Sequence, residues 1–416
     1  MTRRGICVGV HTPTSDWPAE DSLAELAELA TTAGLTIQHS LAQTRPRPNQ
    51  LSYVGKGKLQ EIAHYIQNNA IEVAIFDDEL SPMQQRHIEN ELKVKILDRT
   101  SLVLDIFSQR AQTKEAQIQI ELAQLQYLQP RLRRMWTHLS RLGGGIGTRG
   151  PGETQLEVDR RQIDRRIQKL RNDLEKVRLT RENQRKQRVF TPHLTVAIMG
   201  YTNAGKSTLH HLLTDSGVRQ ENQLFATLDP TTRQLKLPSN DTVLITDTVG
   251  FIRKLPHQLV NAFKATLEEV IYADLILHVI DCSNHQWRDL MKTSHDVLQQ
   301  LDIQLKNELI IFNKIDCAKD PVLTKHDCGE ISTLFINAKQ KDTRDVLIRE
   351  IENNLHQFRT TMTFTIPFNK MSIYNILHKK SAILSTQNTQ DGIIITCKIN
   401  RILGSKIMSD LHSFVD

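Results

Sequence analysis

Hydrophobic positions along this chain change their spacing several times, and these changes divide it into four segments. In the first segment, residues 1–99, short apolar runs at 6–10, 36–42 and 73–76 have the length of strands. Between them, leucine and isoleucine recur at helical spacing, as in residues 22–33. Alternating strand and helix patterns are typical of a parallel α/β sheet, so we predict a small α/β domain here.

A helix start signal supports this division. Ser81 precedes Pro82 at the head of the helical pattern 82–92. Serine accepts a hydrogen bond from a free amide of the first turn, and proline fits the first helical position because the amide lost there has no partner. We predict that a helix begins at Pro82.

The second segment, residues 100–191, has apolar residues at heptad-like spacing on both sides of a glycine run. The pattern predicts two long helices packed antiparallel as a hairpin, with the apolar stripes forming their seam. Basic residues on the outer face of the second helix alternate with acids, as on a solvated surface.

The expected tip of the hairpin differs from the rest. Between Arg131 and Arg149 there are five arginines, one histidine and no acid, with Trp136 among them. Guanidinium groups pair with phosphates, and planar side chains stack on bases, so this composition suits irregular RNA. A charged end exposed to water is the alternative. Two readings are also open for Lys56 and Lys58, which lie at a glycine-flanked turn. They could contact phosphate, or the turn could simply be solvated.

The third segment, about residues 192–354, contains the sequence GYTNAGKS between an apolar run and a helical pattern. This is a complete GxxxxGK[ST] loop in the strand-loop-helix context that phosphate binding requires. Its amides and the helix N-terminus attract phosphate oxygens. The loop comprises Gly200, Tyr201, Thr202, Asn203, Ala204, Gly205, Lys206 and Ser207. Lys206 is expected to contact the β- and γ-phosphates, and Ser207 to bind Mg²⁺.

Two further motifs follow at strand ends. Asp247, Thr248, Val249 and Gly250 form a DxxG sequence, in which the aspartate can hold the Mg²⁺ shell and Gly250 allows the backbone near the γ-phosphate.

The next motif is an NKxD sequence, made of Asn313, Lys314, Ile315 and Asp316. The Asp316 carboxylate can accept hydrogen bonds from N1–H and the 2-amino group of guanine. Adenine offers neither donor, so the three motifs together predict a guanine-nucleotide site. Asn313 would hold the loop, and the stem of Lys314 would lie along the base.

The fourth segment, residues 355–416, predicts a small α+β domain. Residues 361–366 and 393–399 have strand patterns, and residues 372–384 have a helical one. Nothing in these patterns indicates a role.

Composition narrows the class of protein. The chain has 416 residues, 39% hydrophobic and 24% charged, and a formal net charge of +6. Five scattered cysteines without a CxxC pair indicate neither a disulfide framework nor a zinc site. No apolar run reaches the roughly 18 residues of a membrane span. We expect a cytoplasmic protein, monomeric in solution.

Three longer stretches are distinctive: the glycine-rich sequence GGGIGTRGPGETQLE at 143–157, LFATLDPTTR at 224–233, and the continuation of DxxG into Phe251 and Ile252. Together they resemble the HflX family of translation-associated GTPases, and the resemblance extends over about residues 52–365. The glycine-rich sequence is the most specific of these. The resemblance implies a P-loop GTPase with an N-terminal ribosome-binding region.

The same resemblance assigns further site residues. It implies a first switch segment that contacts the nucleotide through Phe225, Ala226, Thr227, Leu228 and Asp229. Thr227 would be the threonine that binds Mg²⁺ when the γ-phosphate is present; Thr231 is the competing candidate. A final loop of Asn337, Ala338 and Lys339 would contact the guanine O6, with asparagine where the family usually has serine. Lys206, Thr227 and Gly250 would act in catalysis.

Two positions bear on the rate of hydrolysis. Phe251 occupies the place where many GTPases carry a water-orienting glutamine, and a phenyl ring cannot orient water by hydrogen bonding. Slow intrinsic hydrolysis, accelerated by a partner, is therefore expected. Asn203 matches a position that binds K⁺ in some related GTPases; a polar residue that caps its own turn is the alternative.

The combined prediction is a GTPase that uses Mg²⁺, binds the large ribosomal subunit and its rRNA, and splits stalled or hibernating ribosomes. Splitting is implied by the resemblance alone. Two alternatives remain: a ribosome-assembly GTPase that acts on immature large subunits, and a nucleotide-dependent RNA remodeller.

Overall fold

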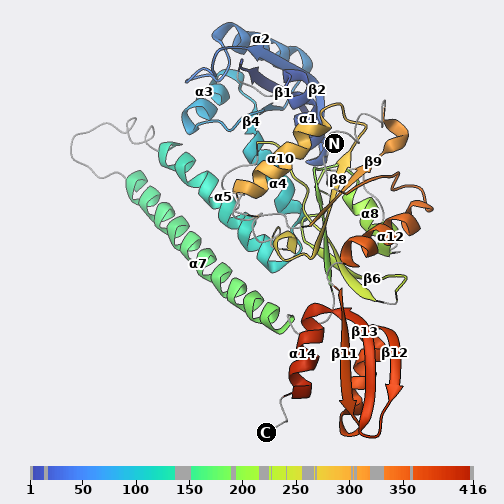
Figure 1. Cartoon of the computed structure of the whole chain (residues 1–416). Helices are drawn as coiled ribbons and strands as arrows, with labels where there is room; N and C mark the ends of the chain where they lie inside the picture. Colours follow the sequence, from blue (N-terminus) through green and yellow to red (C-terminus); the bar gives the residue numbers. More distant parts are fainter. Residues whose placement is uncertain are drawn as a thin grey trace. The chain divides into compact units, whose positions relative to one another are not determined.

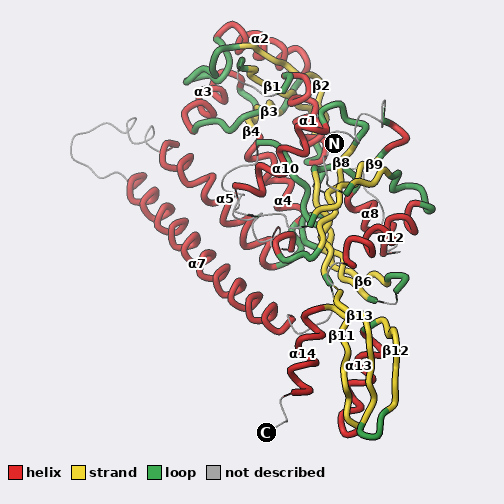
Figure 2. Tube along the Cα trace, viewed as in Figure 1, coloured by secondary structure: helices red, strands yellow, loops and turns green. Residues whose placement is uncertain are grey.

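The computed structural model describes residues 3–13, 17–135, 151–188, 194–214, 224–225, 227–239, 241–254, 267, 269–300, 303, 307–318, 332–356 and 359–412. Its contacts define two compact units. Unit 1 comprises Met1–Val177, Asn222–Asp229 and Ile252–Ala265, and unit 2 comprises Arg178–Glu221, Pro230–Phe251 and Thr266–Asp416. Figure 1 labels their elements, and Figure 2 separates helices from strands. Among the described residues, no helix combines the length and apolar content needed to cross a membrane.

Unit 1 contains a four-stranded parallel sheet in the order β2-β1-β3-β4. The strands are β1 Arg3–His11, β2 Leu35–Thr44, β3 Val73–Phe76 and β4 Lys95–Asp98. The helices between them are α1 Ala19–Thr32, α2 Lys56–Asn69 and α3 Pro82–Leu92. Ile62, Phe76 and Ile88 are fully buried in the core that these elements share. The predicted parallel α/β sheet is confirmed.

Helix α3 begins as its sequence predicts. The Ser81 side chain accepts a hydrogen bond from the Gln84 amide, and the Gln84 side chain accepts one from the Ser81 amide, at 3.2 and 2.9 Å. Pro82 occupies the first turn. This reciprocal pair satisfies two amides that a helix start leaves free.

After the sheet, the described residues form three helices, where the sequence pattern predicted two: α4 Arg99–Arg110, α5 Lys114–Met135 and α7 Pro151–Arg188. The additional helix, α4, begins at a cap in which Asp98 accepts from the Ser101 amide at 2.8 Å. It ends where Ala111 adopts an extended conformation. The prediction missed this break because the apolar stripe on which it rested begins only after it, at Ile118.

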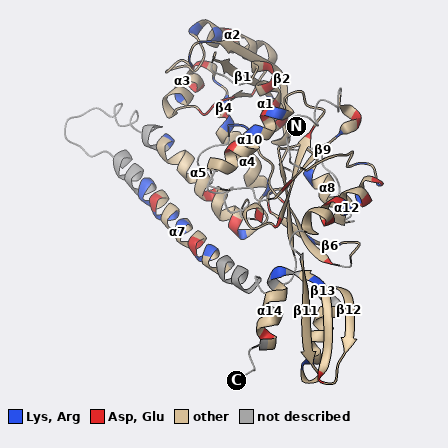
Figure 3. Cartoon of the chain, in the orientation of Figure 1, with Lys and Arg blue, Asp and Glu red and all other residues tan. Residues whose placement is uncertain are grey.

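Helices α5 and α7 run antiparallel. Arg166 of α7 makes two hydrogen bonds with Glu121 of α5, at 2.6 and 2.7 Å, and Gln129 donates to Asp164 at 2.5 Å. Lysine, arginine and acidic residues mix along the described part of α7, as Figure 3 shows. The antiparallel pairing of the hairpin is confirmed; the glycine run at its tip lies outside the described residues.

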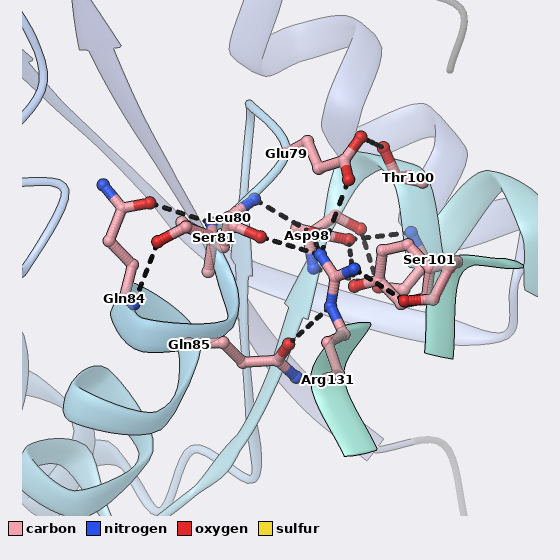
Figure 4. A network of polar contacts seen from close by, with 10 residues as sticks. Glu79, Leu80, Ser81, Gln84, Gln85, Asp98, Thr100, Ser101 and Arg131 are labelled. Atoms are coloured by element: carbon pink, nitrogen blue, oxygen red, sulfur yellow. Dashed lines mark hydrogen bonds and ion pairs between the residues drawn. The ribbon is translucent and has the colours of Figure 1, made fainter. Parts of the chain in front are cut away.

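Arg131 corrects one expectation about that tip. Arg131 is 8% exposed, and its guanidinium donates to the Leu80 carbonyl at 2.7 Å and to Asp98 at 3.2 Å. Gln85 accepts a further hydrogen bond at 3.1 Å, and Glu79 lies within ion-pair distance (Figure 4). Arg131 therefore ties α5 to the sheet and is not available to RNA.

Unit 2 contains a six-stranded sheet in the order β10-β9-β8-β5-β7-β6, in which only β6 is antiparallel to its neighbour. Its strands are β5 Thr195–Gly200, β6 Thr231–Lys236, β7 Thr242–Asp247, β8 Leu275–Asp281, β9 Glu308–Asn313 and β10 Thr333–Phe335. The helices are α8 Lys206–Thr214, α10 Trp287–Gln300 and α12 Thr343–Leu355. Strand β5 lies between β8 and β7, so the order of connection reverses there. Ligands of open α/β sheets bind at the carboxyl end of such a point.

The last part of unit 2 is a three-stranded antiparallel sheet in the order β11-β13-β12, with two helices. Its elements are β11 Arg359–Pro367, α13 Met371–Lys380, β12 Ala382–Asn388, β13 Gly392–Asn400 and α14 Arg401–His412. The predicted α+β class is correct. The predicted helix 372–384 was too long, because Leu384 belongs to β12, and α14 was missed.

Candidate nucleotide site

The glycine-rich loop joins the end of β5 to the start of α8 and depends on two glycines. Gly200 has φ +144°, and a Cβ there would lie 2.2 Å from the Val279 carbonyl oxygen. Gly205 has φ +97°, and a Cβ there would lie 2.2 Å from Nδ2 of Asn313. Side chains are excluded at both positions by conformation and by space. The loop therefore keeps its backbone open at the N-terminus of α8, as phosphate binding requires.

Lys206 is buried beneath this loop. Its side chain is 7% exposed, and its Nζ donates to the Tyr201 carbonyl at 2.7 Å. Burial lowers its pKa to about 8, although the charge of Asp247 acts in the opposite direction. It forms no salt bridge with any carboxylate of the described residues. A buried cation without an anionic partner is costly, and a phosphate group would supply that partner.

Two oxygen-bearing side chains, from the phosphate loop and the DxxG sequence, meet at the end of β7. The Ser207 hydroxyl donates to Asp247 Oδ2 at 2.8 Å, which brings together two oxygens of the kind that Mg²⁺ prefers. The neighbouring Thr248 hydroxyl donates to the Ile198 carbonyl at 2.6 Å and fixes the strand end. These residues fit a Mg²⁺ ion shared with nucleotide phosphates.

Gly250 and Phe251 bring the DxxG sequence against the phosphate loop. A Cβ on Gly250 would lie 2.7 Å from Lys206 Nζ and 2.9 Å from Cγ2 of Thr202. The Phe251 amide donates to the Gly200 carbonyl at 3.0 Å, and the Thr202 amide donates to the Phe251 carbonyl at 2.8 Å. The ring of Phe251 is 1% exposed, so it belongs to the core and cannot position a water.

Asn313 links the NKxD sequence to the other loops. Its Nδ2 donates to the Ala204 carbonyl at 2.9 Å, and its Oδ1 accepts from the Ala338 amide at 3.0 Å. Lys314 has φ +63° and pairs with Asp281 at 2.6 Å. One side chain therefore connects three sequence motifs at the carboxyl end of the sheet.

Asp316 is exposed, in a short 3₁₀ turn with Ile315. The predicted contact with guanine would therefore have to bury this carboxylate under the base itself. Asn337, which replaces the usual serine, accepts from the Lys339 amide at 3.0 Å. This bond holds the loop that carries the Ala338 amide.

The first switch segment belongs to unit 1. Phe225, with φ +56°, packs edge-on against Phe107 of α4 at a centroid distance of 4.6 Å. Asp229 accepts from the Gln112 and Thr113 amides at 2.8 and 3.0 Å and from the Thr113 hydroxyl at 2.5 Å. These bonds form at the start of α5. Leu228 is buried and Thr227 is half-buried; Ala226 lies outside the described residues.

The segment after DxxG also belongs to unit 1, which the sequence did not indicate. Lys254 forms ion pairs with Asp77 and Asp78 at 2.5 and 2.6 Å, just after β3. Arg253 stacks over the buried ring of Trp17, with its guanidinium carbon 3.8 Å from the ring centroid. Lys254 has φ +50°, so tertiary contacts hold the residue in a conformation that lysine rarely adopts. No local pattern could have identified these contacts, because Lys254 and Asp77 are 177 residues apart.

The choice between Thr227 and Thr231 is testable. Thr231 begins β6 and pairs with Asp247 across the sheet, whereas Thr227 lies in the irregular segment before it. We expect Thr227→Ala to slow GTP hydrolysis about 100-fold, because a Mg²⁺ ligand specific to the triphosphate state is lost. GDP affinity should stay unchanged. Thr231→Ala is the matched control, and single-turnover hydrolysis with nucleotide titration would measure both. A loss confined to Thr231→Ala would reverse the assignment.

Three family models match successive parts of the chain. They are described as GTP-binding GTPase N-terminal over residues 20–108, GTP-binding GTPase middle region over 110–188, and 50S ribosome-binding GTPase over 195–314.

Curated relatives match over almost the full length. GTPase HflX of Caldanaerobacter subterraneus subsp. tengcongensis is 44% identical over 410 residues, covering 98% of this chain and 94% of its own. GTPase HflX of Escherichia coli K12 is 39% identical over 383 residues, covering 92% and 90%. A crystal structure of the protein SsGBP in complex with GDP is similar with a TM-score of 0.51 at 26% identity, covering 85% of this chain and 99% of that one.

Proposed function

The chain belongs to the HflX family of GTPases, and from this premise we propose that its GTP form binds the large ribosomal subunit and splits stalled or hibernating ribosomes. GTP hydrolysis then releases the factor. Binding energy of the GTP form drives the separation of subunits, and hydrolysis resets the chain.

The site supplies the groups for hydrolysis. Lys206 places its charge at the β- and γ-phosphates, and the amides of the glycine-rich loop hold the remaining phosphate oxygens. Ser207 and Thr227 are the proposed Mg²⁺ ligands, with Asp247 holding the surrounding shell. Mg²⁺ neutralises charge on the phosphates when bound. The Gly250 amide can approach the γ-phosphate because no side chain intervenes.

The residue that follows DxxG in this chain offers no polar group to orient the attacking water. Phe251 is buried and has no polar group, so the residue next to DxxG cannot orient the water. We therefore propose that the ribosome supplies or reorders the missing group. K⁺ near Asn203 remains a separate expectation, which a comparison of hydrolysis rates in KCl and NaCl would test.

One observation carries the proposed link between nucleotide and ribosome binding. The expected first switch segment and the residues that follow Phe251 lie in the same unit as the N-terminal sheet, through the contacts of Asp229 with Thr113 and of Lys254 with Asp77. A change in either segment must alter the contacts of the N-terminal region. The description of the matching family model, 50S ribosome-binding GTPase, makes the large subunit the expected partner.

Ribosome splitting has a direct test. With a non-hydrolysable GTP analogue, purified chain at excess over 70S ribosomes should separate the subunits once, and GDP should not. Sucrose-gradient profiles measure the fraction separated, and GTP should allow repeated rounds at lower protein concentration. Matched gradients with immature large subunits are the control, because an assembly GTPase would bind those and leave mature ribosomes intact. Intact ribosomes in the presence of the analogue would contradict the proposal.

A further inference from the structure

Three metal-ligating side chains gather beneath α10, on a face of the unit 2 sheet. His278 lies on β8 and Glu308 begins β9, and the register pairs Ile276 with Glu308. Residues 276 and 278 point to the same face of a strand, so His278 and Glu308 share that face. His295 comes from α10, which packs there through Trp287 against Phe312. Sequence spacing did not indicate this cluster because its members come from three separate elements.

The ligand atoms converge closely. Glu308 Oε1 lies 2.6 Å from His278 Nδ1 and 3.1 Å from His295 Nε2. One ligand atom from each of the three side chains lies within 4.8 Å of the other two. Ligands of a tetrahedral zinc ion at about 2.0–2.1 Å are separated by roughly 3.3 Å. The 4.8 Å limit exceeds this separation by about 1.5 Å, so displacements of that size or smaller would convert the hydrogen-bonded arrangement into a coordination shell.

Burial gives the cluster an inner and an outer side. The His278 side chain is fully buried, that of Glu308 is 10% exposed and that of His295 is 34% exposed. The Nε2 atom of His278 is buried with no hydrogen-bond partner among the described residues. The unsatisfied nitrogen is not the one that contacts Glu308, since that contact is made by Nδ1. A ligand could enter from the side of His295, where water reaches the cluster.

We propose that His278, His295 and Glu308 form a binding site for one divalent transition-metal ion, with zinc as the favoured metal and water in the fourth position. Two imidazoles and one carboxylate are a ligand set that zinc uses in proteins with one position open. The proposed Mg²⁺ site at Ser207 and Asp247 offers only oxygen ligands, whereas this cluster offers two imidazole nitrogens. Mg²⁺ and zinc should therefore bind at different sites. Bound zinc would fasten α10 to β8 and β9.

Zinc titration of the full chain, saturated with Mg²⁺ and GDP to occupy the nucleotide site, tests the proposal. The expected result is one zinc ion per chain by calorimetry and by metal analysis after gel filtration, with a rise in melting temperature. Cobalt in place of zinc should give visible absorption bands without thiolate charge transfer. That spectrum separates this site from the exposed Cys317.

Two variants and one control decide the site. His295→Ala should weaken zinc binding by at least about tenfold. Glu308→Gln should do the same. His285→Ala removes an exposed imidazole just before α10 and should bind zinc as the unmodified chain does. GDP affinity checks that each variant is folded. Unchanged zinc affinity in His295→Ala, or no stoichiometric uptake by the unmodified chain, would overturn the proposal and leave a hydrogen-bonded triad.

Discussion

Replacing Lys206 with methionine is expected to stabilise the nucleotide-free chain and to abolish its stabilisation by GTP. Burial lowers the pKa of Lys206 from 10.5 to about 8, so the folded chain holds this charge at a cost. The difference corresponds to about 3 kcal/mol as an upper figure. Methionine has similar length and no charge, so the cost disappears. The substitution also removes the cation that pairs with the phosphates, so nucleotide affinity should fall by about 10³-fold or more.

The gain in stability should depend on pH with a defined sign. A lysine whose pKa is lowered on folding binds more protons in the unfolded chain between the two values, so stability rises with pH there. The advantage of Lys206→Met should therefore be full below pH 8 and should vanish between about pH 8 and 10.5.

Thermal unfolding with and without GDP, at pH 7 and pH 9.5, would measure both effects. Lys292→Met is the matched control, because Lys292 is an exposed lysine of α10 outside the nucleotide site. A lower melting temperature for nucleotide-free Lys206→Met at pH 7 would show that the charge is not a cost in the folded chain. Retained GDP affinity would remove Lys206 from the phosphate site.

Replacing Asp316 with asparagine is expected to exchange guanine for xanthine specificity. Guanine presents two donors, N1–H and the 2-amino group, and only a carboxylate accepts both. Asparagine offers one acceptor and one donor, which match the N1–H and the C2 carbonyl of xanthine. GTP affinity should fall on the order of 10⁴-fold, since a hydrogen bond becomes a clash of donors next to the base. Xanthosine triphosphate should bind the variant and be hydrolysed by it.

A comparison of three nucleoside triphosphates provides the control for this experiment. Competition of GTP, ATP and xanthosine triphosphate against a fluorescent nucleotide would rank affinities for both proteins. Asp289→Asn, at an exposed acid of α10, should keep the original ranking. Equal loss of affinity for all three nucleotides would indicate damage to the loop instead of a change in base recognition.

Local sequence predicted those parts of the molecule whose geometry depends on neighbours in the chain. The spacing from Gly200 to Ser207 needs only a strand, a turn and a helix start, and the structure places these elements in that order. The start of α3 at Pro82 follows from the adjacent Ser81 for the same reason. Strand-helix alternation likewise predicted the N-terminal parallel sheet.

Other parts depend on contacts between distant residues, and the sequence did not reveal them. Lys254 forms ion pairs with Asp77 and Asp78, and nothing in the sequence around it indicates them. Arg131 is one of the arginines that made the hairpin tip look like an RNA-binding segment, yet it is buried against Asp98. The end of α13 and the start of β12 at residue 382 were also missed. The strand that contains Leu384 is short and exposed, and it is held by its pairing with β13. The assigned roles of the site residues and the domain boundaries at 99, 191 and 354 stay predictions.

The bonds of Asp229 at the foot of α5 have one more consequence. Thr113 caps this helix by accepting from the Ala116 amide at 3.2 Å, and Asp229 braces the cap from outside. Withdrawal of Asp229 would free two amides and weaken the first turn by about 1 kcal/mol, which is enough to let a helix end fray. Amide hydrogen exchange at residues 112–116 would then depend on the bound nucleotide. Exchange at the start of α5 would therefore measure whether the first switch segment is in place.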